Sequence, residues 1–273
     1  MGDHAPRRGR LSAAAKMVTQ TSADPVPPCA DLFPPRAVED EAIEAGRHLF
    51  AQASRFVAGA AEPAALPPES LPEIAFAGRS NVGKSSLVNA LTGRRMLARI
   101  SNTPGRTRQI NFFDLGGALM LVDLPGYGYA AASKVAIARW TGLVRRYLQH
   151  RAGLQRVCLL LDARHGLKEA DRPLLDLLDR AGVSYQGVLT KTDKLGPAAL
   201  AATAERVAAE LAKHTAAHPE LHLTSAEQHR GIAALRATLA GFAAGFADTA
   251  GSDLPAAVVP AAGIVVPDPT PLE

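Results

Sequence analysis

The stretch Gly78-Arg79-Ser80-Asn81-Val82-Gly83-Lys84-Ser85 lies between a short apolar run at 74–77 and a helix-like segment at 86–91. Its glycines let the backbone curl so that successive N–H groups point at phosphate oxygens, and the helix start adds partial positive charge. Lys84 is placed to reach the terminal phosphates, and Ser85 is placed to hold a magnesium ion. We call 78–85 the phosphate loop. It predicts a phosphate-bearing ligand.

A second string corroborates this prediction. Asp123-Leu124-Pro125-Gly126 directly follows the apolar run 118–122. There the carboxylate of Asp123 can hold magnesium through water, and the Gly126 N–H can meet a terminal phosphate. A D-x-x-G string alone also fits an ordinary turn. One helix and one hairpin after a phosphate loop, it predicts the second half of a nucleoside triphosphatase site.

A third string identifies the base. Thr190-Lys191-Thr192-Asp193 ends the apolar run 187–189 and fits a T/N-K-x-D pattern. The Asp193 carboxylate would accept hydrogen bonds from the N1–H and the exocyclic amine of guanine. Adenine lacks this pair of donors and would leave the carboxylate unpaired, so the string favours GTP over ATP. The Lys191 stem is expected along the base, with its ammonium reaching back to the phosphate loop.

Two further segments complete the expected site. The small turn Thr224-Ser225-Ala226 after the last strand is expected to present backbone N–H groups to the guanine O6. The polar loop 101–108, with a Pro-Gly break, is expected to order around a triphosphate and relax when the terminal phosphate leaves. It holds two candidate magnesium ligands, Thr103 and Thr107, and the chemistry of the two residues does not choose between them.

Composition sets the broad class of the protein. The chain has 273 residues, 47% of them apolar, which is ample for a buried core, and no stretch is long and apolar enough to cross a bilayer. The start, 1–10, lacks the apolar segment of a secretory signal, so we expect the cytoplasm. The two cysteines, Cys29 and Cys158, suggest neither a zinc site nor a disulfide.

Arginines cluster in two places, which suits a polyanion such as RNA, although solvated helix faces would give the same pattern. The formal net charge is +4. The first cluster comprises Arg94, Arg95, Arg99, Arg106 and Arg108, and the second Arg139, Arg145, Arg146, Arg151 and Arg156.

The pattern of elements predicts an α/β fold with three layers. Residues 1–38 and 248–273 are expected to be disordered tails, 39–69 a lead-in helix (to about residue 58) and a Pro-rich linker, and 70–247 a single GTP-binding domain. Strands are predicted at 73–77, 109–115, 118–123, 156–162, 184–190 and 220–224, and helices at 84–92, 133–150, 169–181, 197–216 and 229–245. The Gly116-Gly117 turn predicts a hairpin. The sheet is therefore expected to be six-stranded and mostly parallel, with one antiparallel edge strand and helices on both faces.

The order of these strings resembles the translation-factor-related GTPases, and finer details resemble the EngB family (also called YihA or YsxC) of bacterial ribosome-biogenesis GTP-binding proteins. The resemblance covers about 70–245 and rests on the phosphate loop with 86–87, on Thr103-Pro104-Gly105-Arg106-Thr107 with 110–113, on 123–130, on Asp162-Ala163-Arg164-His165-Gly166, and on 190–195. The family pattern makes Thr107 the magnesium ligand. Beside the strand-end Asp162, His165 is expected to shape a loop rather than act as an acid or base.

With this resemblance added, the expected site has three sets of residues. Magnesium is expected on Ser85, Thr107 and Asp123, and catalysis on Lys84, Thr107, Gly126 and Asn81. The expected contacts of GTP or GDP are Gly78, Arg79, Ser80, Asn81, Val82, Gly83, Lys84, Ser85, Gly105, Arg106, Thr107, Arg108, Gln109, Asp123, Leu124, Pro125, Gly126, Thr190, Lys191, Thr192, Asp193, Thr224, Ser225 and Ala226.

The residue after D-x-x-G is Tyr127 rather than a water-positioning Gln, so we expect slow hydrolysis. Related GTPases with an Asn at the position of Asn81 use a potassium ion, which makes potassium stimulation a hypothesis. Three aromatic residues in or beside the loop that follows Gly126, namely Tyr127, Tyr129 and Trp140, fit either stacking on a partner or core packing.

The resemblance implies a monomeric switch that acts in assembly of the large ribosomal subunit through contacts with rRNA or subunit proteins, and through it in cell growth, division and septation. Two other functions fit parts of the sequence. A P-loop kinase would share the phosphate loop but would not need T-K-x-D. A nucleotide-dependent partner of cell-division proteins would need no direct ribosome contact.

Overall fold

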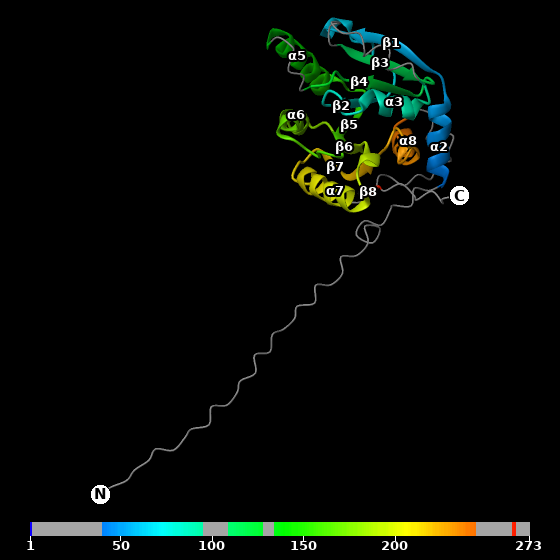
Figure 1. Ribbon diagram of the computed structural model, residues 1–273. Coiled ribbons are helices and arrows are strands. Elements are labelled where there is room, and N and C mark those ends of the chain that lie inside the picture. The colour runs from blue at the N-terminus through cyan, green and yellow to red at the C-terminus, as the bar shows by residue number, and fades with distance from the viewer. Residues whose placement is uncertain (2–39, 95–108, 128–133, 244–263, 266–273) are drawn as a thin grey trace.

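In the computed structural model, residues 1, 40–94, 109–127, 134–243 and 264–265 are described. One sheet of eight strands lies between two layers of helices (Figure 1). The strand order is β1-β3-β4-β2-β5-β6-β7-β8. The strands are β1 (Ser54–Ala60), β2 (Glu73–Gly78), β3 (Ile110–Leu115), β4 (Leu119–Asp123), β5 (Leu154–Asp162), β6 (Tyr185–Thr190), β7 (Ala217–Leu223) and β8 (Ile264–Val265).

Helices cover both faces of the sheet, as predicted. One face carries α5 (Lys134–His150), α6 (Arg172–Ala181) and α7 (Pro197–Leu211), and the other carries α2 (Asp40–Ala51), α3 (Lys84–Thr92) and α8 (Ile232–Ala240) (Figure 1). Three single turns of 3-10 helix are η1 (Pro63–Ala65), η2 (Glu169–Asp171) and η3 (Thr192–Lys194). None of the described helices is long and apolar enough to cross a membrane.

The apolar runs read from the sequence become buried strands because alternate residues serve the two helical layers. In β2, Ile74 and Phe76 pack in the cluster under α2, α3 and α8, whereas Ala75 and Ala77 pack in the cluster under α5, α6 and α7. The α/β class is therefore confirmed, and α3 begins and ends at the predicted residues.

The predicted sheet has six strands and the observed one has eight, and the reversed strand is not at the edge of the sheet where it was predicted. The strand β3 runs antiparallel to both β4 and β1, so it is the one reversed strand among those described, but β1 covers its outer edge. The sequence predicted helix through residue 58, whereas the helix α2 ends at Ala51 and 54–60 form β1.

The apolar residues Phe56 and Val57 suggested the longer helix, yet each is 41% exposed in the structure. Phe56 stacks edge to face on Phe113 of β3, with 5.6 Å between the ring centroids. Pairing with the free edge of β3 satisfies the backbone of 54–60, and local helical periodicity cannot reveal such a distant partner.

The expected tails are only partly tested. Ile264 and Val265, inside the expected disordered tail 248–273, form the short strand β8, which pairs parallel with β7, so the expectation is wrong for these two residues. Apart from Met1, the rest of both expected tails lies outside the described residues, and so do residues 244–247 at the end of the expected GTP-binding domain.

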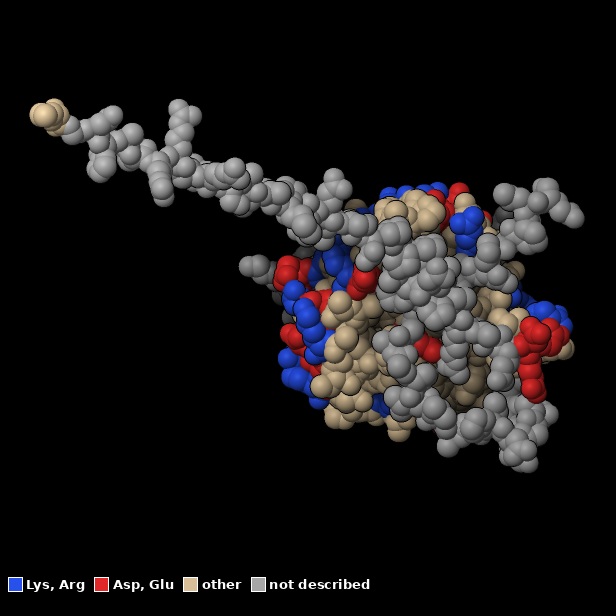
Figure 2. Space-filling view, turned by 90° about the horizontal axis from the view of Figure 1, so that it is seen from below, with Lys and Arg blue, Asp and Glu red and all other residues tan. Residues whose placement is uncertain are grey.

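The expectation that both arginine clusters meet a polyanion is wrong in part. Arg151 forms an ion pair with Glu73, 2.6 Å from Nη2 to Oε1, and its side chain is 6% exposed. Arg156 donates to Gln186 and lies over the ring of Phe242. On the face shown in Figure 2, basic and acidic side chains of the described residues are interspersed. In the second cluster, Arg145 and Arg146 on α5 are exposed.

Candidate functional site

The phosphate loop links β2 to α3 at the carboxyl edge of the sheet. Asn81 and Gly83 have φ of 64° and 102°, in the left-handed region, and the helix α3 begins at Lys84. The first N–H groups of a helix have no acceptor within it, and they face the loop. Together with the loop turn, they form an electropositive cradle suited to phosphate oxygens.

Lys84 and Asp123 meet where α3 begins and β4 ends. The Lys84 ammonium donates to an oxygen of the Asp123 carboxylate. Burial lowers the pKa of Lys84 to about 7. The ion pair with Asp123 opposes this shift, because a neighbouring carboxylate favours the charged ammonium. The predicted second string therefore does reach the phosphate loop.

The donor set here fits magnesium. The hydroxyl of Ser85 follows Lys84 in the chain, so a hydroxyl and the carboxylate of Asp123 come from adjoining parts of the site. Magnesium prefers such oxygen ligands and keeps several waters when few protein ligands are supplied. Thr107, the third predicted ligand, lies outside the described residues.

The segment after Asp123 is bonded directly to the phosphate loop. The Ser80 N–H donates to the Tyr127 carbonyl (2.9 Å), and the Tyr127 N–H donates to the Gly78 carbonyl (3.3 Å). A Cβ on Gly126 would lie 3.2 Å from the Ser80 nitrogen, so a larger residue would push the two segments apart. Leu124, in contrast, is buried in the core.

Tyr127 points into the protein rather than toward a partner. Its hydroxyl donates to Asp171 of η2 over 2.7 Å. Burial, and then the Asp171 carboxylate, raise the pKa of Tyr127 well above its ordinary value. The aromatic residue therefore ties the segment after Gly126 to the start of α6, which favours the core-packing interpretation for this tyrosine.

A pocket of about 360 Å³ brings the other two predicted strings together beside the phosphate loop. Asp193 lies at its wall, with its side chain 4% exposed. Burial opposes ionisation, but hydrogen bonds from Ser225 and Lys194 hold the pKa of Asp193 below its ordinary value. The pocket is lined by Gly83, Ser86, Leu87, Arg164, Thr190, Lys191, Asp193, Lys194, Thr224, Ala226 and Glu227.

Lys191 connects this pocket to the phosphate loop, as the sequence predicted. With a left-handed φ of 58°, it directs its ammonium to the Asn81 carbonyl (2.6 Å) and to Asp162 at the end of β5 (3.0 Å). The preceding residue, Thr190, donates its hydroxyl to the Val82 carbonyl over 2.6 Å. Two side chains of one string therefore fix the turn of the phosphate loop.

The turn after β7 is held against the same string. The Ser225 hydroxyl donates to Asp193 over 2.6 Å, and the Thr192 N–H donates to the Thr224 carbonyl over 3.2 Å. Thr224 and Ser225 are both fully buried. The buried Ser225 side chain acts by orienting the Asp193 carboxylate, while Ala226 lines the pocket.

The sequence analysis named Asp162 only as part of the resemblance to the EngB family. Burial raises the pKa of this carboxyl, but hydrogen bonds from Arg164 and Lys191 more than offset that, so the net shift is well below the ordinary value. Asp162 thus holds Lys191 in place. Its position at the end of an apolar run is the same signal that identified Asp123.

Several predicted residues are not brought to the site. The side chain of Gln109 donates to Asn111 and lies against Gly59 of β1. Other predicted positions lie outside the described residues, namely Thr103, Gly105, Arg106, Thr107, Arg108, Tyr129 and the side chain of Trp140. His165 is an exposed residue of the loop after β5.

Comparison with known proteins identifies the family and supports the fold. A family model described as "50S ribosome-binding GTPase" matches residues 73–191. A crystal structure of Era from Aquifex aeolicus bound to GDP·AlF4⁻ superposes with a TM-score of 0.50 at 20% identity, over 64% of this chain and 57% of Era, which supports the fold.

Two curated relatives are much closer in sequence. The "Probable GTP-binding protein EngB" of Rhodospirillum rubrum is 58% identical, over 74% of this chain and 90% of that protein. The protein of the same name from Cereibacter sphaeroides is 53% identical, over 76% of this chain and 96% of that protein. By this similarity over nearly the whole length of its relatives, the chain belongs to the EngB family of GTP-binding proteins.

Proposed function

We propose that this protein binds GTP and GDP with magnesium, hydrolyses GTP slowly, and acts as a switch in assembly of the large ribosomal subunit. The observation that carries the proposal is the single pocket in which Gly83, Lys191 and Asp193 meet. It joins the end of the phosphate cradle to an ionised carboxylate, which is the arrangement that a guanine nucleotide requires.

The Asp193 carboxylate supports guanine over adenine. It already has a fixed orientation, because Ser225 donates to one of its oxygens, and its low pKa keeps it an acceptor at neutral pH. Guanine supplies two donors on one edge, and adenine does not. A buried acceptor left unpaired costs roughly 1–3 kcal/mol, more when it is charged, so the site would discriminate against ATP.

Magnesium would be held by Ser85 and Asp123, with Thr107 proposed from the family pattern. When bound, the ion would neutralise charge on the terminal phosphates. In the structure, Lys84 donates to Asp123. With a triphosphate present, the same ammonium is placed to turn to the phosphate oxygens and to stabilise charge that develops there.

Slow intrinsic hydrolysis is supported by the contacts of Tyr127. The residue after Gly126 cannot position water as a Gln would, because its hydroxyl is bonded to Asp171. Asn81 has an exposed side chain at the turn of the loop, consistent with potassium stimulation. A potassium site would be contradicted if the rate of GTP hydrolysis were the same in potassium and sodium buffers and if Asn81→Gly left this rate unchanged. Glycine keeps the left-handed φ of that residue.

The role in ribosome assembly is supported by the family description that matches 73–191. We further propose that the protein is a monomer in the cytoplasm, and that cell growth, division and septation depend on it through the ribosome. The alternative is a nucleotide-dependent partner of cell-division proteins without ribosome contact. Pull-down of purified ribosomal subunits with GTP, with GDP and without nucleotide, at two salt concentrations, separates them. Failure to enrich the large subunit in any state would exclude the ribosomal role.

The first test concerns the base. In magnesium buffer, GTP at about 100 times its Kd should stabilise the native protein by about 2.7 kcal/mol, whereas ATP at the same concentration should leave the melting temperature unchanged. Equal stabilisation by ATP would contradict the proposed role of Asp193. GDP is the matched control, because it keeps the guanine contacts and lacks only the terminal phosphate.

A further inference from the structure

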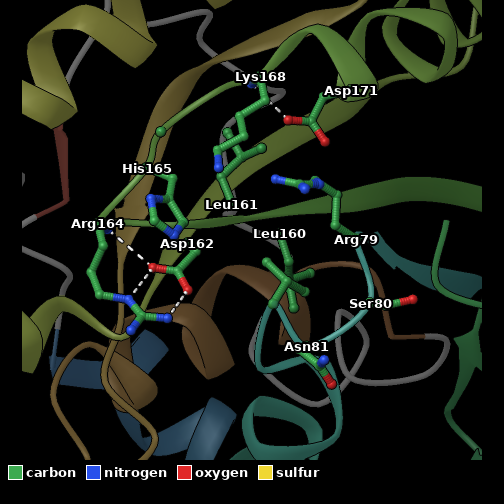
Figure 3. A pocket seen from close by; sticks show the side chains of 12 residues that line it. Arg79, Ser80, Asn81, Leu160, Leu161, Asp162, Arg164, His165, Lys168 and Asp171 are labelled. Atoms are coloured by element: carbon green, nitrogen blue, oxygen red, sulfur yellow. Dashed lines mark hydrogen bonds and ion pairs between the residues drawn. The ribbon is translucent and has the colours of Figure 1, made fainter. Parts of the chain in front are cut away.

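A second pocket, of about 190 Å³, lies between the phosphate loop and the segment after β5 (Figure 3). Its lining includes Arg79 and Asn81 of the loop, and His165, Lys168 and Asp171 of the segment. We call it the Arg79–Lys168 pocket. Within it, the side chains of Arg79 and Lys168 extend toward each other from opposite sides (Figure 3).

Of the three cations that line this pocket, Arg164 is paired with Asp162, whereas within the described part of the chain Arg79 and Lys168 each have a group without a partner. Among the described residues, the buried Nε of Arg79 has no hydrogen-bond partner, and the Lys168 ammonium forms no ion pair. Buried polar groups in proteins are nearly always hydrogen-bonded, so an unpartnered guanidinium nitrogen at a pocket wall indicates a missing acceptor.

The two carboxylates of the pocket are already engaged elsewhere. Asp162 accepts from Arg164 and from Lys191. Asp171 is fully buried and accepts from the Tyr127 hydroxyl (2.7 Å) and from the Lys168 N–H (2.8 Å). The lining has three cations, Arg79, Arg164 and Lys168, against the two carboxylates, so its net charge is positive by one. An anion is the ligand that fits.

We propose that the Arg79–Lys168 pocket binds a backbone phosphate of ribosomal RNA. The inference rests on the proposed function, since it assumes that the partner is the large ribosomal subunit. An Arg fork and a Lys point charge are the groups that hold phosphate oxygens in proteins. Arg164 and His165, which also line the pocket, are exposed. An RNA strand would offer them neighbouring phosphates, whereas a single acidic side chain would not.

The pocket is also joined to the part of the site that responds to the terminal phosphate. Asp171 at its wall accepts from the hydroxyl of Tyr127, the residue directly after Gly126. Ser80, also at its wall, donates its backbone N–H to the Tyr127 carbonyl. A displacement of the segment after Asp123 would therefore move both walls. RNA phosphate and nucleotide are expected to influence each other's binding.

The test compares Lys168→Gln with Arg180→Gln in the full chain. Arg180 is an exposed cation at the far end of α6, so its variant controls for the loss of one positive charge. Binding to purified large ribosomal subunits is measured with a non-hydrolysable GTP analogue and magnesium, between about 50 and 200 mM salt. GTP affinity of both variants, measured without ribosomes, should equal that of the wild type.

If Lys168 neutralises an RNA phosphate, the slope of log Kobs against log[salt] should become shallower by about 0.7–0.9 in Lys168→Gln, and Lys168→Arg should restore it. Arg180→Gln should keep the wild-type slope. An unchanged slope in Lys168→Gln would overturn the proposal, and so would weaker binding at an unchanged slope, which indicates a protein contact. A wild-type protein that binds no subunits would instead refute the proposed function itself.

Discussion

Asp193 contacts other protein residues in the structure, and we propose that it also contacts the base. Ser225 and Lys194 donate to it in the structure, and the guanine edge would donate to the same carboxylate. This explains why the string around it could be recognised from the sequence, while the role of Ser225 in orienting it could not. A buried hydroxyl gives no signal in the sequence beyond its place after a strand.

Replacing Asp193 with Asn should weaken GTP binding at least tenfold. The amide cannot accept from both guanine donors, and hydrogen bonds to charged groups contribute about 1.5–3 kcal/mol each. The new N–H of the amide can donate to the 2-oxo group of xanthine, so the affinity for XTP should rise. Titration calorimetry with GTP and XTP tests both, with Glu227→Gln, a neutralised carboxylate of the same pocket, as control. Equal losses for the two nucleotides would contradict the assigned base contact.

His222 on β7 carries a pH dependence of stability. It is 1% exposed, and burial, followed by the charges of His218 and Arg156, lowers its pKa from 6.5 to about 3. Between these values the unfolded chain binds a proton that the folded chain does not. The free energy of unfolding should therefore fall as the pH falls below 6.5, by about 1.5 kcal/mol at pH 5 from this residue.

His222→Leu should remove that contribution. Among the described residues neither ring nitrogen of His222 has a hydrogen-bond partner, so the apolar variant loses no bond. Urea unfolding at pH 7 and pH 5 should show a smaller acid loss in this variant than in the wild type. The exposed His229, replaced by Asn, serves as control and should keep the wild-type pH dependence. An identical loss in His222→Leu would show that the buried ring is not the source.

At the scale of elements, the sequence predicted the strands and helices whose apolar residues are buried. The run at 74–77 became β2, and the helix after the phosphate loop was placed at its observed ends, 84–92. The edge strand β1 was missed, because all but one of its residues are exposed or half-buried and its only described strand partner, β3, lies about fifty residues further on. Pairing of this kind depends on tertiary context rather than on local pattern.

The turn that begins α8 depends on Gly231. It has a φ of 68°, and a Cβ there would collide with the carbonyl oxygen of Leu223, the residue that ends β7. Gly182, which ends α6, has a φ of 65° but open space around it. Gly231→Ala should therefore cost clearly more than Gly182→Ala, for which strain in the left-handed region alone predicts about 1 kcal/mol.

Urea unfolding of the two glycine variants measures this difference, and GTP affinity measures its consequence. The Ser225 N–H donates to the Arg230 carbonyl, next to Gly231, so displacing this turn should disturb the hydroxyl that orients Asp193. GTP binding should weaken in Gly231→Ala and stay at the wild-type level in Gly182→Ala. Equal stability of the two variants would mean that the turn relaxes without moving β7.

At the scale of the whole molecule, the site exists because parallel strands end at one edge. The phosphate loop, Asp123, Asp162 and Asp193 follow four different strands, and contacts such as that of Lys191 with Asn81 span 110 residues of sequence. The order of the strings along the chain therefore predicted that they meet at this edge. Side-chain links between strings, such as Tyr127 to Asp171, could not be predicted, because nothing in a string specifies its neighbour in the fold.

The same links make the molecule a candidate two-state switch, and thermodynamic linkage gives a strict test of it. Tyr127 joins the segment after Gly126 to η2 and thereby to the Arg79–Lys168 pocket. If a GTP analogue raises the affinity for large ribosomal subunits by some factor, the subunits must raise the affinity for the analogue by the same factor, typically 5–150-fold for such couplings. Both factors are measurable with a fluorescent GTP analogue and sedimentation of subunits.

The variant Tyr127→Phe, which removes the bond to Asp171, should reduce both factors together. Its affinity for the analogue in the absence of subunits should stay within a few-fold of the wild-type value. Equal coupling in Tyr127→Phe and the wild type would show that the nucleotide acts on the ribosome through another route.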